Sequence, residues 1–87
     1  MKFKKMRGVK KPEEVQGLIY YTCRNYHKQP HHIRRKIDDL CVQQGGDKAE
    51  ALREWLISGC DAVYVSQKYH WSESALYAAR RRFFNSW

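Results

Sequence analysis

Eighty-seven residues with a formal net charge of +8 define one small domain, because so short a chain can bury only a modest core. Three Trp, six Tyr and three Phe provide the large apolar surfaces that such a core needs. The sequence has no apolar run of membrane-spanning length and no signal-peptide pattern. Its cysteines are odd in number and lack paired spacing, which argues against a disulfide framework, so we expect a cytoplasmic protein.

The positive charge lies at the two ends of the chain. Residues 1–11 hold six basic residues and no acidic one, whereas residues 12–79 carry a net charge of −1. Three consecutive arginines follow, at Arg80, Arg81 and Arg82. This distribution indicates a polyanionic partner, and the alternative is a solvated tail together with a solubilising helix end.

Residues 1–11 show no apolar period, and we expect them to form a flexible basic arm attached to a single folded domain of residues 12–87. Pro12, followed by two glutamates, is suited to begin a first helix, which must end before Pro30. The predicted buried face of this helix consists of Val15, Leu18, Ile19, Thr22 and Tyr26.

Two further helices follow from caps and apolar stripes. The second begins near Pro30 and ends at Gly45–Gly46. Its apolar stripe consists of Ile33, Ile37, Leu40 and Cys41. Asp47 and Glu50 have the spacing of a capping box at the start of the third helix, which Gly59 ends. Its predicted buried residues are Ala51, Leu52, Trp55 and Leu56.

Residues 62–82 have the pattern of two short helices joined by a tight turn. Asp61 and Ser72 are suited to cap the first and the second helix. His70 takes the turn position that needs a left-handed backbone, and the apolar side chain of Trp71 is expected to fill the inside of the turn. The inward stripes consist of Val65, Tyr69, Leu76, Ala79 and Phe83. The sequence therefore predicts an all-α domain of about five helices with a C-terminal helix-turn-helix.

The helix-turn-helix pattern and the charge together indicate DNA binding. With Leu76 inward, Ser74, Ala78 and Arg81 lie on the outward face of the second helix of the motif. An arginine there can donate two hydrogen bonds to guanine or enter a narrow minor groove. The candidate DNA-binding residues are Gln67, Lys68, Ser72, Ser74, Tyr77, Ala78, Arg80, Arg81 and Arg82, with Lys4, Lys5 and Arg7 in the arm.

The last residues, 83–87, are unusually aromatic for a chain end. Phe83 continues the inward stripe, but Phe84 and Trp87 exceed what one helix needs. Either Trp87 packs back against the first helix, or these side chains form a dimer seam, since helix-turn-helix domains commonly bind two half-sites as pairs.

The segments EWLISG at 54–59 and VYVSQKY at 63–69 resemble the bacterial fimbrial (adhesin) operon regulators of the PapB and FocB type, over about residues 33–84. The resemblance implies an all-α helix-turn-helix domain that forms homodimers or larger oligomers and binds repeated AT-rich DNA sites, with the minor groove implicated. It also implies regulation of pilus transcription and basic DNA contacts at Arg80, Arg81 and Arg82. A plasmid or phage repressor of the TrfB/KorA kind, reading the major groove, is similar as well.

The residue chemistry favours a protein that is not an enzyme and needs no cofactor. The sequence has no Gly-rich phosphate loop and no recognisable catalytic set. Cys23 and His27 have a workable metal-ligand spacing on one helix face, but Pro30 separates them from His31 and His32, and we predict no metal site. A protein-interaction adaptor and a zinc-stabilised domain remain the alternatives to a DNA-binding regulator.

Overall fold

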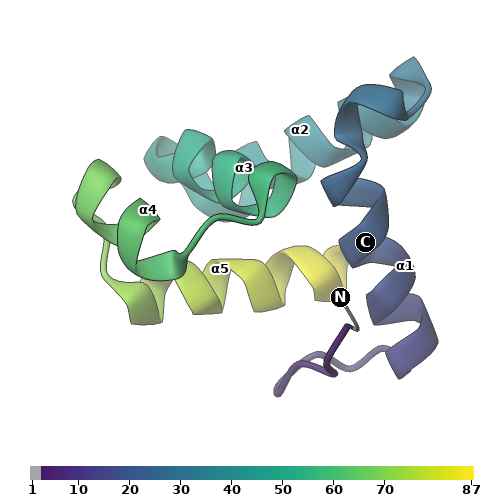
Figure 1. Cartoon of the computed structure of the whole chain (residues 1–87), viewed down its shortest axis with the longest axis horizontal. Helices are drawn as coiled ribbons and strands as arrows, with labels where there is room; N and C mark the ends of the chain where they lie inside the picture. Colours follow the sequence, from purple (N-terminus) through teal and green to yellow (C-terminus); the bar gives the residue numbers. More distant parts are fainter. Residues whose placement is uncertain (1–2) are drawn as a thin grey trace.

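The computed structural model describes residues 3–87, and every regular element in that range is helical, which confirms the predicted all-α class (Figure 1). The α-helices are α1 (Glu13–Arg24), α2 (His31–Gly45), α3 (Ala49–Ser58), α4 (Ala62–Tyr69) and α5 (Glu73–Ser86). Short 3-10 turns at Tyr26–Lys28 and Gly46–Lys48 lead into α2 and α3.

The helix α5 forms the base on which the other helices are arranged. In Figure 1 it crosses the lower part of the molecule, with α4 at its N-terminal end and α1 beside its C-terminal end. The pair α2 and α3 lies above it, and α3 also packs against α1 and α4. No helix within residues 3–87 is long and apolar enough to cross a membrane.

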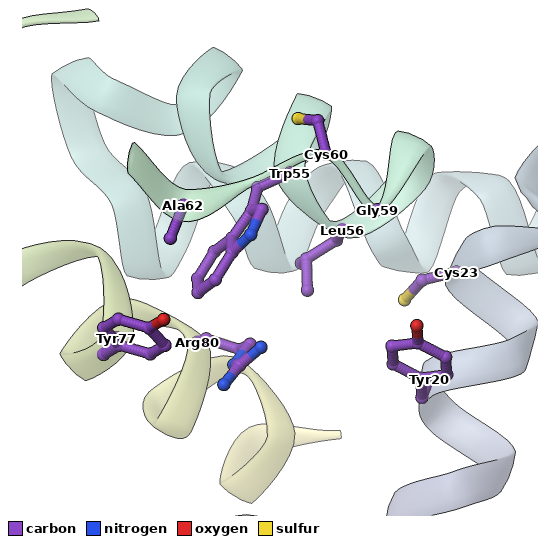
Figure 2. Close-up of a pocket in the computed structure, with 9 residues that line it drawn as sticks. All are labelled: Tyr20, Cys23, Trp55, Leu56, Gly59, Cys60, Ala62, Tyr77 and Arg80. Atoms are coloured by element: carbon purple, nitrogen blue, oxygen red, sulfur yellow. The ribbon is translucent and has the colours of Figure 1, made fainter. Parts of the chain in front are cut away.

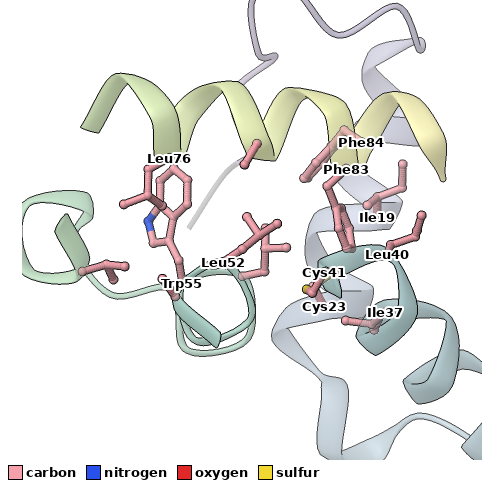
Figure 3. Packing of buried hydrophobic residues seen from close by; sticks show 14 of the residues in the cluster. Ile19, Cys23, Ile37, Leu40, Cys41, Leu52, Trp55, Leu76, Phe83 and Phe84 are labelled. Atoms are coloured by element: carbon pink, nitrogen blue, oxygen red, sulfur yellow. The ribbon is translucent and has the colours of Figure 1, made fainter. Parts of the chain in front are cut away.

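One apolar core lies between α5 and the helices α1, α2 and α3 (Figure 3). The predicted stripes of α2, α3 and α5 supply most of it, and Leu76, Ala79 and Phe83 are completely buried. Val65 of α4 is buried as predicted, whereas Tyr69 and Trp71 are only partly buried at the edge. The 3.6-residue period was sufficient to identify these faces because each helix turns a single face to the core.

The end of α3, both ends of α4 and the start of α5 lie at the capping residues that the sequence predicts. Gly59 ends α3 and His70 ends α4, both with left-handed backbones at φ 69° and 53°. The Asp61 carboxylate accepts a hydrogen bond from the Val63 amide at 3.1 Å, and the Ser72 hydroxyl accepts one from the Ala75 amide at 3.2 Å. These predicted caps are confirmed, and they fix where α4 and α5 begin.

The predicted capping box of α3 is wrong. Gly46, at φ 57°, turns the chain into the 3-10 turn that contains Asp47, and α3 begins only at Ala49. Lys48 occupies the N-cap position, and no side chain caps the helix. Asp47 therefore lies inside a turn, where it lacks the extended backbone that an N-cap residue requires.

The predicted buried face of α1 is partly wrong. Leu18 is 65% exposed, whereas Gln16 is completely buried together with Ile19 and Cys23. The helix also ends at Arg24, earlier than Pro30 requires. The buried face of α1 is rotated from the predicted one because a non-helical segment, rather than another helix, covers the side of α1 that carries Gln16.

That segment is the basic N-terminus, residues 3–11, which we call the N-terminal strap. The Gln16 side chain accepts a hydrogen bond from the Met6 amide at 2.8 Å and donates one to the Lys11 carbonyl at 2.8 Å. Val9 is buried in the core cluster, and the Phe3 ring packs on Tyr20 at 5.3 Å. This packing differs from the free arm that the charge pattern predicts.

Part of the aromatic C-terminus belongs to the core of the domain. Phe84 is completely buried, and Trp87 lies 6.0 Å from Phe83, with the Lys36 ammonium of α2 4.2 Å above its ring. Trp87 therefore contacts Phe83 of α5 and the Lys36 side chain of α2.

Candidate nucleic-acid interface

The helices α4 and α5 are joined by His70, Trp71 and Ser72, and this connection is held by its own backbone and by the 3-10 turn that precedes α3. The Trp71 amide donates a hydrogen bond to the Ser66 carbonyl at 3.0 Å, which closes the end of α4. The Lys48 ammonium donates to the Tyr69 carbonyl at 2.8 Å. Both contacts pin the turn, so the start of α5 has a fixed direction.

A second set of contacts ties α4 to α3. Glu54 accepts hydrogen bonds from the Lys68 ammonium and the Tyr69 hydroxyl, each at 2.9 Å. These bonds, first from Lys68 and then from Tyr69, hold the pKa of Glu54 below its ordinary value. Lys68 is therefore exposed but already paired, and Gln67 beside it is exposed on the outer side of α4.

The N-terminal half of α5 presents an open polar face. Ser74 and Tyr77 are exposed there, and Ala78 is partly buried. Ser72 is exposed as well, but its hydroxyl caps the helix. The Tyr77 ring stands edge-on to Trp55 at 5.2 Å, which leaves its outer side facing solvent.

The three arginines of α5 point in three different directions. Arg81 is exposed, and Arg82 is exposed while donating a hydrogen bond to the Gln44 carbonyl at 2.9 Å. Arg80 turns inward, with its guanidinium 4.4 Å from the Trp55 ring centre and 5.1 Å from that of Tyr77. Burial lowers the pKa of Arg80. The structure thus places Arg80 on the Trp55 side of α5, whereas the family resemblance implies that it contacts DNA.

The N-terminal strap lies against the C-terminal half of α5. The Asn85 side chain donates a hydrogen bond to the Gly8 carbonyl at 3.1 Å and accepts one from the Lys10 amide at 2.8 Å. A Cβ on Gly8 would lie 2.7 Å from Cδ of Arg81, so the strap passes directly beside that side chain. The strap therefore covers part of the expected reading face and brings its own charges to it.

The exposed cations of the strap and the exposed Arg81 of α5 form what we call the basic surface, made of Lys4, Lys5, Arg7, Lys10 and Arg81. The ion pairs among residues 3–87 join Arg53 to Asp38 and Lys68 to Glu54, and neither involves the strap or α5. The strap cations therefore have no carboxylate that neutralises them. Gln16 and Asn85 hold the strap in place, and no sequence pattern identified them, because the strap contacts each of them across the fold.

The cysteines and histidines form no metal centre in the part of the chain that the structure describes, where no three His, Cys, Asp or Glu side chains gather. Cys23 and Cys41 are buried in the core, and His27, His31 and His32 are exposed. Burial, and to a smaller extent the Cys41 thiol, raises the pKa of Cys23 to about 12.

Cys60 is expected to react with a thiol reagent faster than Cys23 or Cys41 at about pH 8. Cys60 is partly exposed, whereas burial raises the pKa of Cys41 from 9.0 to about 12, as it does for Cys23. Colorimetric thiol titration should give one fast group in the folded protein and three after denaturation. Equal rates for all three in the folded protein would contradict the buried placement.

The same thiols predict alkaline destabilisation. A group whose pKa is raised by folding stabilises the folded state below its unfolded pKa, and that contribution is lost as the pH rises through its folded pKa. For Cys23 and Cys41 the loss begins above about pH 9 and continues toward about pH 12. Thermal melting over this range should show a smaller decline for the double Cys→Ala variant than for the parent chain.

Comparisons with protein-family models, with curated proteins and with solved structures found no match for this chain.

Proposed function

We propose that this chain is a DNA-binding transcriptional regulator in which α4 and α5 act as a helix-turn-helix and α5 enters a groove of the duplex. The observation that carries this proposal is the basic surface, which joins the strap to the outward side of α5 without an acidic partner. Unneutralised cations beside an exposed helix are the footprint expected for a polyanion.

The exposed residues divide into two proposed roles. Ser74, Tyr77 and Arg81 face the bases or the adjacent sugar-phosphate, and the small Ala78 permits close approach. Phosphate contacts, which position a protein without reading sequence, come from Gln67, Lys68, Ser72, Arg82, Lys4, Lys5 and Arg7. Arg80 supports α5 from the Trp55 side instead of contacting DNA.

The resemblance to the PapB and FocB type supports a narrower proposal, a cytoplasmic regulator of a fimbrial or adhesin operon that binds AT-rich sites as a homodimer or larger oligomer. Phe83 and Phe84 are completely buried and cannot contribute to the proposed dimer contact. Leu18 and Tyr21, three residues apart on α1, are 65% and 42% exposed and provide a candidate.

The deciding experiment is fluorescence anisotropy of labelled AT-rich and GC-rich duplexes at several salt concentrations. A DNA-binding regulator should bind with an affinity that falls linearly with salt on logarithmic axes, and it should prefer one duplex. A repressor of the TrfB/KorA kind should instead show a defined operator with base contacts in the major groove. Absence of salt-dependent binding to any duplex would favour the protein-interaction adaptor.

Arg81→Ala is expected to weaken DNA binding by about 1–3 kcal/mol without changing the melting temperature appreciably. Arg81 is exposed on the proposed reading face, and its removal deletes one base or minor-groove contact. Arg35→Ala removes the same charge from an exposed position on α2 and is the matched control. If Arg81→Ala and Arg35→Ala bind DNA with equal affinity, the assignment of α5 as the reading helix is wrong.

A further inference from the structure

A cavity of about 230 Å³ lies between α1, the α3–α4 connection and α5. Figure 2 shows Trp55 and Leu56 on one side of it and Arg80, Tyr77 and Tyr20 on the other. The volume is below the 300–1,000 Å³ that is usual for drug-sized ligands, so an occupant has to be a small fragment.

The cavity is lined by a cation that lacks an acidic counterpart. The Arg80 Nε atom is inaccessible to solvent and has no hydrogen-bond partner, while the guanidinium stacks on Trp55. None of the lining residues is acidic. An anion in the cavity can accept only from the terminal nitrogens of this guanidinium, and such charge-assisted hydrogen bonds are among the strong ones.

A second guanidinium strengthens the positive field at the other wall. Arg24 donates a hydrogen bond to the Tyr20 hydroxyl at 2.9 Å. Its guanidinium also occupies the space where a Cβ of Gly59 would project, and Gly59 lines the cavity. The left-handed glycine at the end of α3 thus allows a cation to approach the cavity from α1.

We propose that this cavity binds a small aromatic carboxylate, with the carboxylate on Arg80 and the ring against the Tyr20 side of the cavity. The planar fork of an arginine matches the two oxygens of a carboxylate. Trp55 already contacts Arg80 and Tyr77. The lining left for a planar ring is therefore the part of the cavity formed by Tyr20 and Leu56. A spherical inorganic anion would satisfy the charge but would leave this part of the cavity without a partner.

The test is a titration of the ¹⁵N-labelled full chain with sodium benzoate at constant ionic strength, followed by NMR. The indole N–H signal of Trp55, assigned with a Trp55→Phe variant, should move and saturate. Benzamide, which has the same shape without the charge, should bind roughly 10- to 100-fold more weakly, because it loses the charge-assisted hydrogen bonds. Inorganic phosphate should not saturate the signal.

Arg80→Gln should weaken benzoate binding by roughly 10- to 100-fold. Arg35→Gln, on α2, is the matched control, since it removes an exposed arginine charge outside the cavity and should leave benzoate binding unchanged. If circular dichroism shows that Arg80→Gln does not fold, the comparison of benzoate with benzamide on the parent chain decides. These measurements use no DNA, so their result is independent of the proposed regulatory function.

Several outcomes would overturn the proposal. Equal binding of benzoate and benzamide would show that the charge of Arg80 is not used. Saturation by phosphate would show a general anion site rather than one for an aromatic acid. Shifts confined to signals of the basic surface, with Trp55 unmoved, would place the benzoate outside the cavity.

Discussion

Replacing Phe83 by alanine is expected to lower the free energy of unfolding by about 3–5 kcal/mol, the range for truncating a buried aromatic side chain. Phe83 is completely buried and lies 6.0 Å from both Phe84 and Trp87. Truncation therefore removes its own burial and also leaves a cavity beneath two neighbouring rings. Urea unfolding followed by circular dichroism measures the change, and Phe83→Leu, which retains most of the volume, should be less destabilising.

Leu18→Ala is the matched large-to-small control. Leu18 is 65% exposed, so its truncation should change the free energy of unfolding by no more than about 0.5 kcal/mol. The sequence pattern alone predicts the opposite, a buried Leu18 on the inner face of the first helix. A large loss for Leu18→Ala together with a small one for Phe83→Ala would show that both helices are rotated from their described positions.

The sequence predicts well what depends on neighbouring residues. A cap such as Asp61 or Ser72 depends on a backbone amide two or three residues along the sequence. The left-handed backbone of His70 likewise depends on the geometry of a single turn. Sequence analysis fails for α1 because the face of that helix is set by a segment that has no period of its own. Gln16 is buried by its hydrogen bonds to the strap, and polarity gives no sign of such burial.

The arginine run shows the same limit within the candidate site. Successive residues on a helix are separated by about 100°, so Arg80, Arg81 and Arg82 cannot share one face. Helical spacing placed Arg81 outward, where the structure also has it exposed. It did not show that Trp55 of α3 and the Gln44 carbonyl of α2 would engage the two flanking arginines.

The strap is expected to contribute to both stability and DNA binding, and two variants separate these contributions. Val9→Ala keeps every charge and removes two methyl groups from the core, which should cost about 1.5 kcal/mol at roughly 0.8 kcal/mol for each group. For a domain of this size such a loss corresponds to a fall of several degrees in melting temperature. DNA affinity at a temperature well below the transition should change little.

The triple variant Lys4→Gln, Lys5→Gln, Arg7→Gln should have the opposite effect. These side chains are exposed, so the melting temperature should be nearly unchanged. Each phosphate contact that is lost should reduce the slope of log affinity against log salt by about 0.9, which gives a decrease of about 2.7 if all three contact phosphates. The loss of affinity should be similar on specific and random DNA, because phosphate contacts carry no sequence information.

Deleting residues 1–11 should combine the two effects, lowering the melting temperature and flattening the salt dependence together. The deletion removes the buried Val9 and the strap atoms that bind Gln16 and Asn85, whereas a free arm would leave the domain equally stable. A deletion that lowers the melting temperature without changing the salt slope would exclude the strap as a DNA contact. A deletion that changes only the salt slope would show that the strap does not stabilise the domain in solution.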